Sequence, residues 1–403
     1  MEALGDTPVV AVNGPRQAGK STLVSTLLEI PDLEFVTLDD RIQRAAALAD
    51  PEAFVEERQG PLAIDEVQRA PDLLLAIKAT VDRDRRPGRF VLTGSTRLLS
   101  TPRLSESLAG RVEIVDLWPL SQGELARRPE RFVDRLLAWD PALRSPGQLR
   151  RADYFDLVCG GGLPEALRRA GRRRSAWLSG YATTVIDRLT VEVAEIERAS
   201  AMPTLLRLCA ARTATELNVS SMAAELGIPH RTLGTYLAHL RTVFLVDLLP
   251  AWSRNLTSKV VHRPKLVMVD SGLAAHLLGV GPGALSGLPP ETNPAAPGQL
   301  LESFVVMEIR KQLGWSEADA SLHHFRNRDG AEVDLVLETR DGRVAGIEVK
   351  AARGVTSRDF RGLRLLEGKL GDAFAGGVVL YTGREAVPFG HKLAALPVSS
   401  LWA

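Results

Sequence analysis

The segment PVVAVNGPRQAGKSTLVSTLLEI, close to the start of the chain, limits the possible folds more than any other feature. It reads as an apolar strand, a glycine loop and a helix, and the loop fits the pattern G-x-x-x-x-G-K-S. In such a loop, backbone N–H groups surround phosphate oxygens, the lysine reaches the β and γ phosphates, and the serine hydroxyl ligates Mg²⁺. The sequence therefore predicts a site for ATP and Mg²⁺. We expect nucleotide contacts from Gly14, Pro15, Arg16, Gln17, Ala18, Gly19, Lys20, Ser21 and Thr22.

Two later strands end in polar residues that fit the same chemistry. PLAIDE ends in Asp65 and Glu66, which predicts that Asp65 joins Ser21 in holding Mg²⁺ and that Glu66 polarises the attacking water. RFVLTGSTRLL carries the cluster Thr93-Gly94-Ser95 at the end of its strand. We expect this cluster, with Ser95 as its candidate site residue, to sense the γ-phosphate from a strand lying between the other two. Together these residues predict ATP hydrolysis.

Composition sets broad limits on the protein class. A chain of 403 residues with 45% hydrophobic and 25% charged residues is globular and long enough for two or three domains. A net charge of +1 gives no overall attraction to nucleic acid, so such binding must come from local patches. The basic run RRAGRRR, residues 168–174, is either such a patch or a solvated helix surface.

Cysteine usage and hydropathy bear on the cell compartment. Cys159 and Cys209 are far apart and have no C-x-x-C spacing, which indicates a reducing compartment and argues against zinc or a disulfide framework. No apolar run reaches membrane-spanning length, and the N-terminus lacks a signal peptide. We therefore expect a cytoplasmic protein with no membrane partner.

The middle of the chain predicts a helix-turn-helix module. The segment ELNVSSMAAELGIPHRTLGTYLAHLRTVFLVDLL, within residues 205–249, has the helix, glycine turn, helix spacing of a winged helix-turn-helix. His230, Arg231, Thr235 and His239 of the second helix are candidates for groove contacts. Because helix-turn-helix folds also serve as protein-interaction modules, both DNA and protein remain open as partners of this region.

The segment GAEVDLVLETRDGRVAGIEVKA, residues 330–351, reads as a β-hairpin with charges inside its strands. A two-residue loop at 341–342 would point Asp334 away from Glu348, whereas a three-residue loop at 340–342 would place them opposite each other. The longer loop also aligns the apolar residues on one face, so we predict that register. The other face would then collect Asp334, Glu348 and Lys350, either as a divalent-metal site or as an exposed salt-bridged surface.

The elements around this hairpin suggest a fold. A helix containing Glu302 and the strand SLHHFRN precede it, and the helix TSRDFRGLRLLEGKLG and the strand GGVVLYT follow it. This order, helix, three strands, helix, strand, resembles the PD-(D/E)xK, restriction-endonuclease-like fold, although Val333 stands where the motif has proline. The resemblance implies a nuclease site in which Asp334 is the first-strand carboxylate, Glu348 and Lys350 form the E-x-K pair, and Glu302 is the helix carboxylate.

A second resemblance covers nearly the whole chain. With VTLDD and SLAGRVEIVDLWPLS beside the phosphate loop, the chain resembles AAA+-type ATPases, in particular bacterial and archaeal ATP-binding proteins of the AAA_14/DUF4143 family. YFDLVCGGGLPEAL, LVMVDSGLAAHLLG and GAEVDLV continue the likeness. It implies that Arg111 could act in trans on a neighbouring subunit's nucleotide, which would require a homo-oligomer. The alternative is a surface salt bridge from Arg111 to Glu113 or Asp116. Family members usually carry a helical segment before the first strand, so we expect part of the adenine pocket to be missing or the start codon to be set too late.

These features predict an α/β protein with a P-loop NTPase core of the AAA+/ASCE type and a helical lid, a winged helix-turn-helix middle region and a restriction-endonuclease-like C-terminal domain. The predicted domains are a core at 1–125, a lid at 126–198, a helix-turn-helix at 199–278, a Gly/Pro-rich linker at 279–299 and a nuclease-like domain at 300–403. We expect the nucleotide state to control the helix-turn-helix and nuclease-like modules on DNA. The alternatives are an ATP-regulated, metal-dependent DNA nuclease, and a nucleotide-regulated binding or scaffold protein with an inert C-terminal domain.

Overall fold

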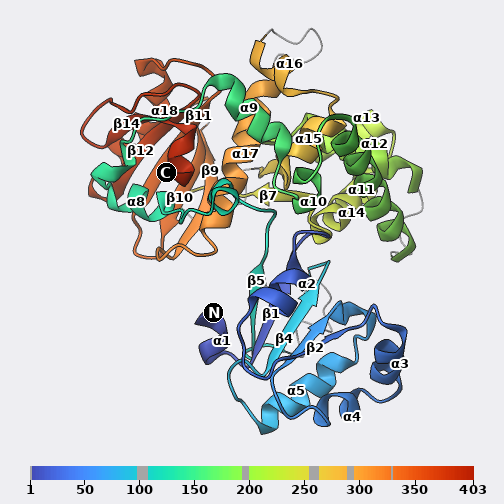
Figure 1. Ribbon diagram of the computed structural model, residues 1–403. Coiled ribbons are helices and arrows are strands. Elements are labelled where there is room, and N and C mark those ends of the chain that lie inside the picture. Colours follow the sequence, from blue (N-terminus) through green and yellow to red (C-terminus); the bar gives the residue numbers. More distant parts are fainter. Residues whose placement is uncertain (1, 98–107, 193–198, 254–262, 288–294, 328–329) are drawn as a thin grey trace. The chain divides into compact units, whose positions relative to one another are not determined.

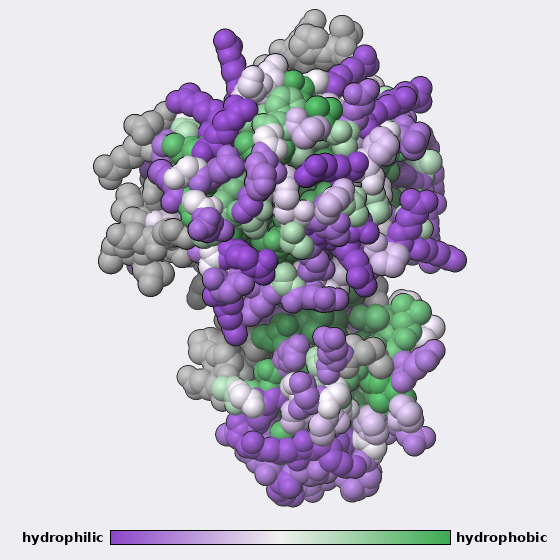
Figure 2. Space-filling view, turned by 90° about the vertical axis from the view of Figure 1, so that its left-hand side faces the viewer, coloured by the Kyte–Doolittle hydropathy of each residue, from purple (hydrophilic) through white to green (hydrophobic). Residues whose placement is uncertain are grey.

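The computed structural model describes residues 2–97, 108–192, 199–253, 263–287, 295–327 and 330–403 (Figure 1). The chain forms two compact units. Unit 1 comprises Met1–Pro119 with Thr242–Phe244, and unit 2 comprises Leu120–Arg241 with Leu245–Ala403. Hydrophilic side chains cover most of the face drawn in Figure 2, with hydrophobic ones visible between them. In the described part of the chain, no helix combines the length and apolar character needed to cross a bilayer.

Unit 1 is built on a parallel, five-stranded sheet of order β2-β3-β4-β1-β5. Its strands are β1 Val9–Asn13, β2 Glu34–Thr37, β3 Leu62–Asp65, β4 Phe90–Gly94 and β5 Val112–Asp116. The strand that carries Ser95 at its end lies between those that end at the phosphate loop and at Asp65, as the sequence predicted. Because the strands are parallel, their polar carboxyl ends meet at one edge of the sheet.

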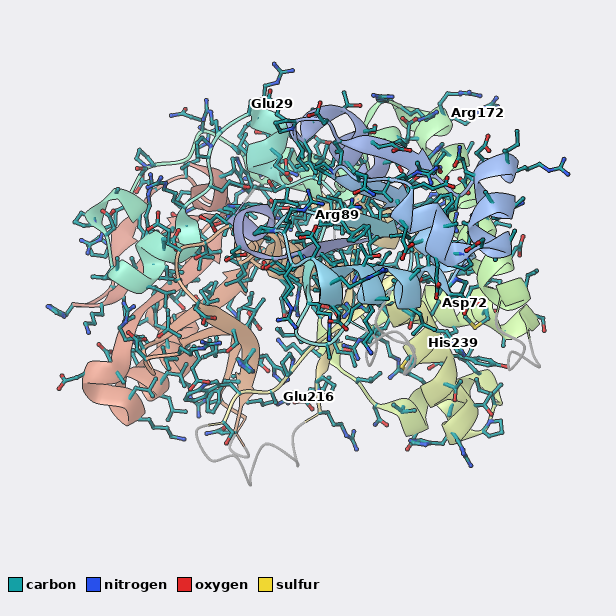
Figure 3. All side chains as sticks on the ribbon, turned by 90° about the horizontal axis from the view of Figure 1, so that it is seen from below. Glu29, Asp72, Arg89, Arg172, Glu216 and His239 are labelled. Atoms are coloured by element: carbon teal, nitrogen blue, oxygen red, sulfur yellow. The ribbon has the colours of Figure 1, made fainter. Side chains whose placement is uncertain are left out.

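Helices connect and cover these strands. They are α1 Glu2–Asp6, α2 Lys20–Thr22 with a π-helical turn Leu23–Leu27, α3 Arg41–Ala49, α4 Pro51–Glu56, a 3-10 turn Val67–Arg69 and α5 Leu73–Arg83. Asp40 begins α3 by accepting hydrogen bonds from the backbone N–H groups of Ile42 and Gln43. The buried Arg89, labelled in Figure 3, donates to the carbonyl oxygens of Gly60 and Arg58 and so ties the loop before β3 to β4.

The middle region of unit 2 contains two helices joined by a glycine turn. Its elements are α12 Met202–Ala211, β6 Thr215–Glu216, α13 Val219–Leu226, α14 His230–Thr242, β7 Val246–Leu249 and β8 Lys265–Met268. Gly227 ends α13 with a φ of 62°, in the left-handed region that favours glycine. The predicted spacing of helix, glycine turn and helix is therefore present, next to a three-stranded sheet of order β6-β8-β7.

Further helices of unit 2 lie before and after this region. They are α7 Gln122–Ala126, α8 Phe132–Ala138, α9 Arg151–Gly160, α10 Pro164–Leu167, α11 Gly171–Glu192, α15 Ser271–Leu277 and α16 Pro282–Gly287. Within the predicted lid, residues 126–198, the described helices α8, α9, α10 and α11 belong to unit 2, where the Phe132 N–H donates to Gln312 Oε1 at 3.1 Å. The predicted Gly/Pro-rich linker at 279–299 contains α16 and the first residues of the helix Ala296–Gln312, so it is not irregular throughout.

The C-terminal part of unit 2 has the predicted order of a helix, three strands, a helix and a strand. The elements are α17 Ala296–Gln312, β9 Ala320–Arg326, β10 Glu332–Thr339, β11 Val344–Lys350, α18 Arg361–Leu370, β12 Phe374–Tyr381, β13 Val387–Pro388 and β14 Leu393–Pro397. They form a six-stranded mixed sheet of order β13-β14-β12-β11-β10-β9. Leu335 pairs with Ile347 and Leu337 with Ala345, and Gly342 has a φ of 86°, so the three-residue loop register is correct.

One of the two alternatives for this hairpin, the exposed salt-bridged surface, was wrong. Asp334 and Glu348 are not on a solvated face, since their exposed fractions are only 5% and 6%. The sheet is covered on both faces, so β10 is buried at nearly every position. A β-bulge in the pairing with β9 between Val333 and Val336 also breaks the simple alternation of faces.

Candidate ATP site and a buried lysine–carboxylate cluster

The phosphate loop joins β1 to α2 and brings its lysine back onto its own backbone. Lys20 Nζ donates to the carbonyl oxygens of Gly14 at 2.9 Å and Pro15 at 2.8 Å. A Cβ on Gly14 would lie 2.2 Å from the Leu117 carbonyl oxygen, so only glycine fits this close approach. Burial lowers the pKa of Lys20 to about 8, against the opposing attraction of nearby carboxylates. A buried ammonium held only by neutral carbonyls is well suited to an incoming phosphate.

The remaining predicted loop residues differ in exposure. Gln17 has a left-handed φ of 61°, which helps to curve the loop. Pro15 and Ala18 are buried, Arg16 and Gly19 half-buried, and Gln17, Ser21 and Thr22 exposed.

The two residues predicted to hold Mg²⁺ lie side by side. Ser21 Oγ donates to Asp65 Oδ1 at 3.0 Å. Thr93 Oγ1 donates to the same carboxylate oxygen, and Thr37 Oγ1 donates to Asp65 Oδ2 at 3.2 Å. A carboxylate and a hydroxyl at this spacing are hard oxygen donors, which fits Mg²⁺. Thr93 belongs to the predicted sensor cluster, whereas Thr37 was not among the predicted site residues, although both come from strands that end at this edge of the sheet.

The predicted catalytic residues Glu66 and Ser95 also meet. Ser95 Oγ donates to Glu66 Oε2 at 3.3 Å. Gln68, which the sequence analysis missed, donates from Nε2 to the same Glu66 oxygen at 2.7 Å and to Ser95 Oγ at 3.2 Å. Glu66 has a left-handed φ of 58°, an uncommon conformation for a non-glycine residue and one found at active sites. The carboxylate is thus held beside the phosphate loop by two donors.

Arg111 lies at the opposite edge of the sheet. Val9 pairs with Val112, so Arg111 precedes β5 at the amino ends of the strands, away from the phosphate loop of its own subunit. Its guanidinium forms an ion pair of 2.6 Å with Asp82 of α5 and holds the pKa of that carboxyl below its usual value. The salt bridge to Glu113 or Asp116 that the sequence suggested is therefore replaced by a different one. A role in trans stays a prediction.

The four residues predicted as a nuclease site come together in unit 2, with a fifth that the sequence analysis missed. Lys265 Nζ, at the start of β8, donates to Glu302 Oε1 at 2.5 Å and to Asp334 Oδ1 at 3.1 Å. Asp334 Oδ2 accepts from the Val349 N–H at 3.0 Å, and Lys350 Nζ donates to Glu348 Oε1 at 2.7 Å. The cluster thus holds three carboxylates and two ammonium groups.

The electrostatics of this lysine–carboxylate cluster follow from its burial. Burial and then repulsion from Asp334 raise the pKa of Glu302 to about 8 and that of Glu348 to about 8. Burial lowers the pKa of Lys265, but Glu302 and Asp334 outweigh that effect and hold it above its usual value. The ammonium therefore stays charged between the two carboxylates.

The donor set does not fit a divalent metal. Lys265 Nζ occupies the space between Glu302 and Asp334 that a cation would need. Within the residues that the structure describes, no group of three or more His, Cys, Asp or Glu side chains is arranged to hold a metal ion. This arrangement does not favour the metal alternative for Asp334 and Glu348, because a lysine from a different part of the chain places its ammonium against Asp334.

The residues predicted to contact DNA lie on the first turns of α14. His230 and Arg231 are exposed, and Thr235 is half-buried with its Oγ1 donating to the Arg231 carbonyl at 3.3 Å. His239 is half-buried further along the helix. Contact of these residues with DNA stays a prediction.

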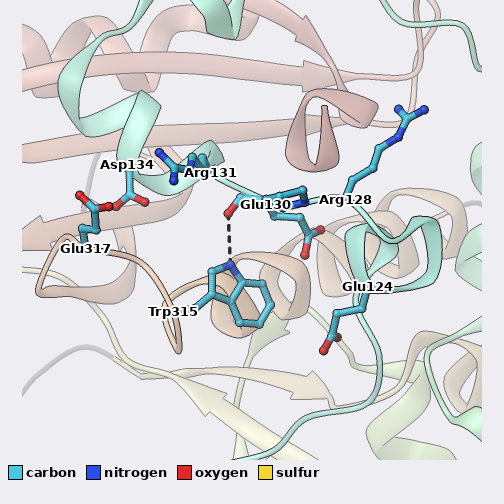
Figure 4. Close-up of a pocket in the computed structure, with 8 residues that line it drawn as sticks. Glu124, Arg128, Glu130, Arg131, Asp134, Trp315 and Glu317 are labelled. Atoms are coloured by element: carbon cyan, nitrogen blue, oxygen red, sulfur yellow. Dashed lines mark hydrogen bonds between the residues drawn. The ribbon is translucent and has the colours of Figure 1, made fainter. Parts of the chain in front are cut away.

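An acidic cavity of about 380 Å³ in unit 2 was not foreseen (Figure 4). Trp315 Nε1 donates to the Glu130 carbonyl oxygen at 3.1 Å, the bond drawn in the figure. The Glu130 carboxylate accepts from Ser121 Oγ at 2.5 Å and from the Gly123 N–H at 2.9 Å. Burial raises the pKa of Glu130 to about 7 despite these bonds. Its hydrogen-bond partners fix it in the fold, so this carboxyl is structural.

Comparison with known proteins identifies the family. The uncharacterized protein Rv2008c of Mycobacterium tuberculosis and the uncharacterized protein Mb2031c of Mycobacterium bovis are each 31% identical over 402 residues, covering 99% of this chain and 82% of theirs. The chain belongs to the same family as these mycobacterial proteins. Within this family protein, residues 6–126 match the model of an AAA domain, 151–284 a domain of unknown function (DUF8612) and 297–401 a domain of unknown function (DUF4143).

The predicted AAA domain and DUF4143 region are thereby confirmed, and the AAA domain implies nucleotide binding. The DUF8612 region was not anticipated. Among solved structures, a Walker-type ATPase of Pyrococcus abyssi aligns with a TM-score of 0.38 and 16% identity, over 69% of this chain and 93% of its own.

Proposed function

We propose that this family protein hydrolyses ATP at the carboxyl edge of the unit 1 sheet. The observation that carries the proposal is the convergence of the phosphate loop, the Ser21–Asp65 pair and the Glu66–Ser95–Gln68 group, which come from three neighbouring parallel strands. A phosphate-binding loop alone would bind nucleotide. A carboxylate held by two donors next to it adds a group able to take a proton from water.

Each side chain has a defined task in this reaction. Lys20 leaves the Gly14 and Pro15 carbonyls and contacts the β and γ oxygens of ATP, which restores an ordinary pKa to its ammonium. Ser21 and Asp65 would hold Mg²⁺, which supplies positive charge to the same oxygens. Glu66 orients water and accepts its proton as the water oxygen bonds to the γ phosphorus and the bond to ADP breaks. Gln68 and Ser95 keep the Glu66 carboxylate in place.

Two substitutions separate binding from turnover. Lys20→Ala should abolish ATP binding, whereas Glu66→Gln should bind ATP normally and turn over at least about a hundredfold more slowly, since it removes only the proton acceptor. Glu57→Gln, an equal change at an exposed glutamate of unit 1, is the matched control and should leave both quantities unchanged. Binding is measured by equilibrium titration and turnover by phosphate release. Equal ATPase rates in Glu66→Gln and the wild type would remove Glu66 from the mechanism.

For the helix-turn-helix region we propose DNA as the partner, controlled by the nucleotide state. The exposed His230 and Arg231 at the start of α14 support this, because the first turns of the second helix face the groove in such folds. Arg231→Ala should weaken duplex binding by about tenfold and reduce its dependence on salt. An unchanged affinity and salt slope, measured by fluorescence anisotropy with and without ATP, would leave a protein partner as the alternative.

For the C-terminal domain, Lys265 supports the alternative without nuclease activity. A metal-dependent nuclease needs a cation between the carboxylates, and in this cluster a buried lysine fills that place. We therefore expect labelled plasmid and linear DNA to remain uncut with Mg²⁺ or Mn²⁺, with or without ATP. Cleavage by the wild type that disappears in Glu348→Ala would refute this and favour the nuclease.

A further inference from the structure

A second cavity of unit 2, with a volume of about 480 Å³, is lined mainly by arginine. Its residues are Arg150, Arg151, Arg353, Tyr381, Thr382, Gly383, Arg384 and Glu385. Four of these side chains are guanidinium groups and one is a carboxylate. Like charges gathered around one cavity repel each other, so a bound anion would relieve the repulsion in this arginine cavity.

Three chain segments form this arginine cavity. β11 and β12 are parallel neighbours in which Lys350 pairs with Tyr381, so the loops that follow them leave the sheet at the same edge. Thr382 Oγ1 donates to the Ala352 carbonyl at 2.8 Å and ties these two loops together. Arg151 starts α9 and reaches across to the first loop, donating from Nε to the Ala351 carbonyl at 3.3 Å. Loops after parallel strands are a common place for ligands in α/β sheets.

The arginines have few partners of opposite charge. Arg151 donates to the neutral carbonyls of Ser286 and Ala351 and lies over the Phe155 ring, 5.1 Å from its centroid. Burial, followed by repulsion from Arg353, lowers the pKa of Arg151. In the described part of the chain, neither Arg151, Arg353 nor Arg384 forms an ion pair with a carboxylate.

The other charged groups near the cavity do not cancel this excess. Arg150 is paired with Asp153, to which its guanidinium donates from Nε and Nη2 at 3.4 Å each and its backbone N–H donates at 2.7 Å, and Arg384 acts on the same carboxylate from a distance. One carboxylate thus serves two of the four arginines. Glu385 is exposed, and its carbonyl oxygen, not its carboxylate, accepts the Tyr381 hydroxyl at 2.8 Å. The amino end of α9, a helix of 10 residues, adds further positive potential at Arg151.

We propose that this arginine cavity binds a phosphate group. Guanidinium groups present paired N–H donors that match phosphate oxygens, and several of them around one cavity suit a doubly charged or repeated anion. The phosphate comes either from a small phosphorylated molecule or from a nucleic-acid backbone, which share this chemistry. The cavity lies in unit 2 and the phosphate loop in unit 1, so the inference does not depend on ATP hydrolysis.

The test uses full-length protein carrying Lys20→Ala, which removes phosphate binding at the ATP site. Arg353→Gln and Arg384→Gln change exposed side chains, so the fold should tolerate both; unchanged thermal unfolding checks this. Arg340→Gln is the matched control, since its side chain is 89% exposed and lies at the hairpin turn, at the other end of β11 from Lys350. Inorganic pyrophosphate is titrated by calorimetry and a labelled single-stranded oligonucleotide by fluorescence anisotropy.

We expect the double Arg353→Gln, Arg384→Gln variant to lose about tenfold or more in affinity for at least one probe, while Arg340→Gln stays within about twofold. Loss for pyrophosphate alone identifies a small phosphorylated ligand, and loss for the oligonucleotide alone identifies a nucleic-acid backbone. The proposal is overturned if neither probe binds, or if the control variant loses as much affinity as the double variant. A failure of ATP hydrolysis in unit 1 leaves these outcomes unchanged.

Discussion

The substitution Lys265→Met is the most direct test of the lysine–carboxylate cluster. Methionine matches the length of the lysine stem and removes only the charge and its hydrogen bonds. The side chain of Lys265 is 9% exposed, and its ammonium contacts Glu302 at 2.5 Å and Asp334 at 3.1 Å. Without it, Lys350 is the only ammonium left in a cluster of three buried carboxylates.

The expected cost is large because the carboxylates remain buried. Breaking a buried ion pair by removing one partner costs about 3 to 5 kcal/mol, since the other charge stays uncompensated. The loss should also depend on pH. Glu302 has an ordinary pKa of 4.5 and a folded pKa of about 8 even beside Lys265, and its pKa rises further when the lysine is absent. A carboxyl with a raised folded pKa binds its proton more tightly in the native state, so stability falls as the pH rises from 4.5 toward the folded pKa. The variant should therefore be closest to the wild type near pH 5 and lose most near pH 9.

Urea unfolding followed by tryptophan fluorescence measures this, because five of the six tryptophans, all except Trp118, belong to unit 2. Lys265→Arg, which keeps the charge, should lose less than Lys265→Met. Glu302→Gln should be more stable than the wild type at pH 9, because it cannot ionise, and combining it with Lys265→Met should recover part of the loss, since one buried carboxylate is gone. Equal unfolding midpoints for Lys265→Met and the wild type at pH 9 would refute the charge argument. So would a loss that does not change with pH.

Three further outcomes follow from individual contacts. Gln68→Ala should slow ATP turnover by about tenfold with an unchanged Kd for ATP, because it removes a donor that positions Glu66; a weaker Kd with unchanged turnover would contradict this role. If Arg111 acts in trans, Arg111→Ala should lower ATPase activity more than ATP affinity, and mixing it with Lys20→Ala should restore part of the turnover. No rescue, together with a monomeric mass by light scattering, argues against assembly. The wild type should lose at most about 3 kcal/mol of stability as the pH rises from 4.5 to the folded pKa of Glu130, about 7, and Glu130→Gln should not show this loss. Parallel pH profiles of stability for the two proteins would show that Glu130 does not titrate in this range.

The ATP site was predictable because its determinants are local. The phosphate loop, the Asp65-Glu66 pair and Ser95 each follow directly on an apolar strand, and parallel strands bring such ends together. Gln68 was missed because its contact with Glu66 depends on the left-handed turn at Glu66, which reverses the chain just after β3. No sequence pattern predicts that a glutamate adopts left-handed backbone angles.

For the C-terminal hairpin, the sequence pattern predicts the register but not the burial or the contact with Lys265. Its register follows from a period of two and a glycine turn, both of which are short-range properties. Its burial depends on the helices that cover it, which the hairpin sequence does not contain. Lys265 lies 37 residues from Glu302 and 69 from Asp334 along the chain. The sequence gives one hint of this contact: a lysine begins the apolar strand KLVM, and a buried lysine requires a partner of opposite charge.

The long reach of Lys265 also explains why the middle and C-terminal regions form one unit although they match separate family models. β8 belongs to the sheet beside α13 and α14, whereas Glu302 and Asp334 belong to α17 and β10. Two further contacts cross the same boundary. Thr213 Oγ1 donates to Ser303 Oγ at 2.9 Å, and Arg310 pairs with Asp247 of β7 at 3.2 Å. Because these polar contacts are buried or half-buried, separating the two regions would leave charged groups without their partners, at a cost of several kcal/mol. The lysine–carboxylate cluster, the Thr213–Ser303 hydrogen bond and the Arg310–Asp247 ion pair therefore link the middle region to the C-terminal sheet within unit 2.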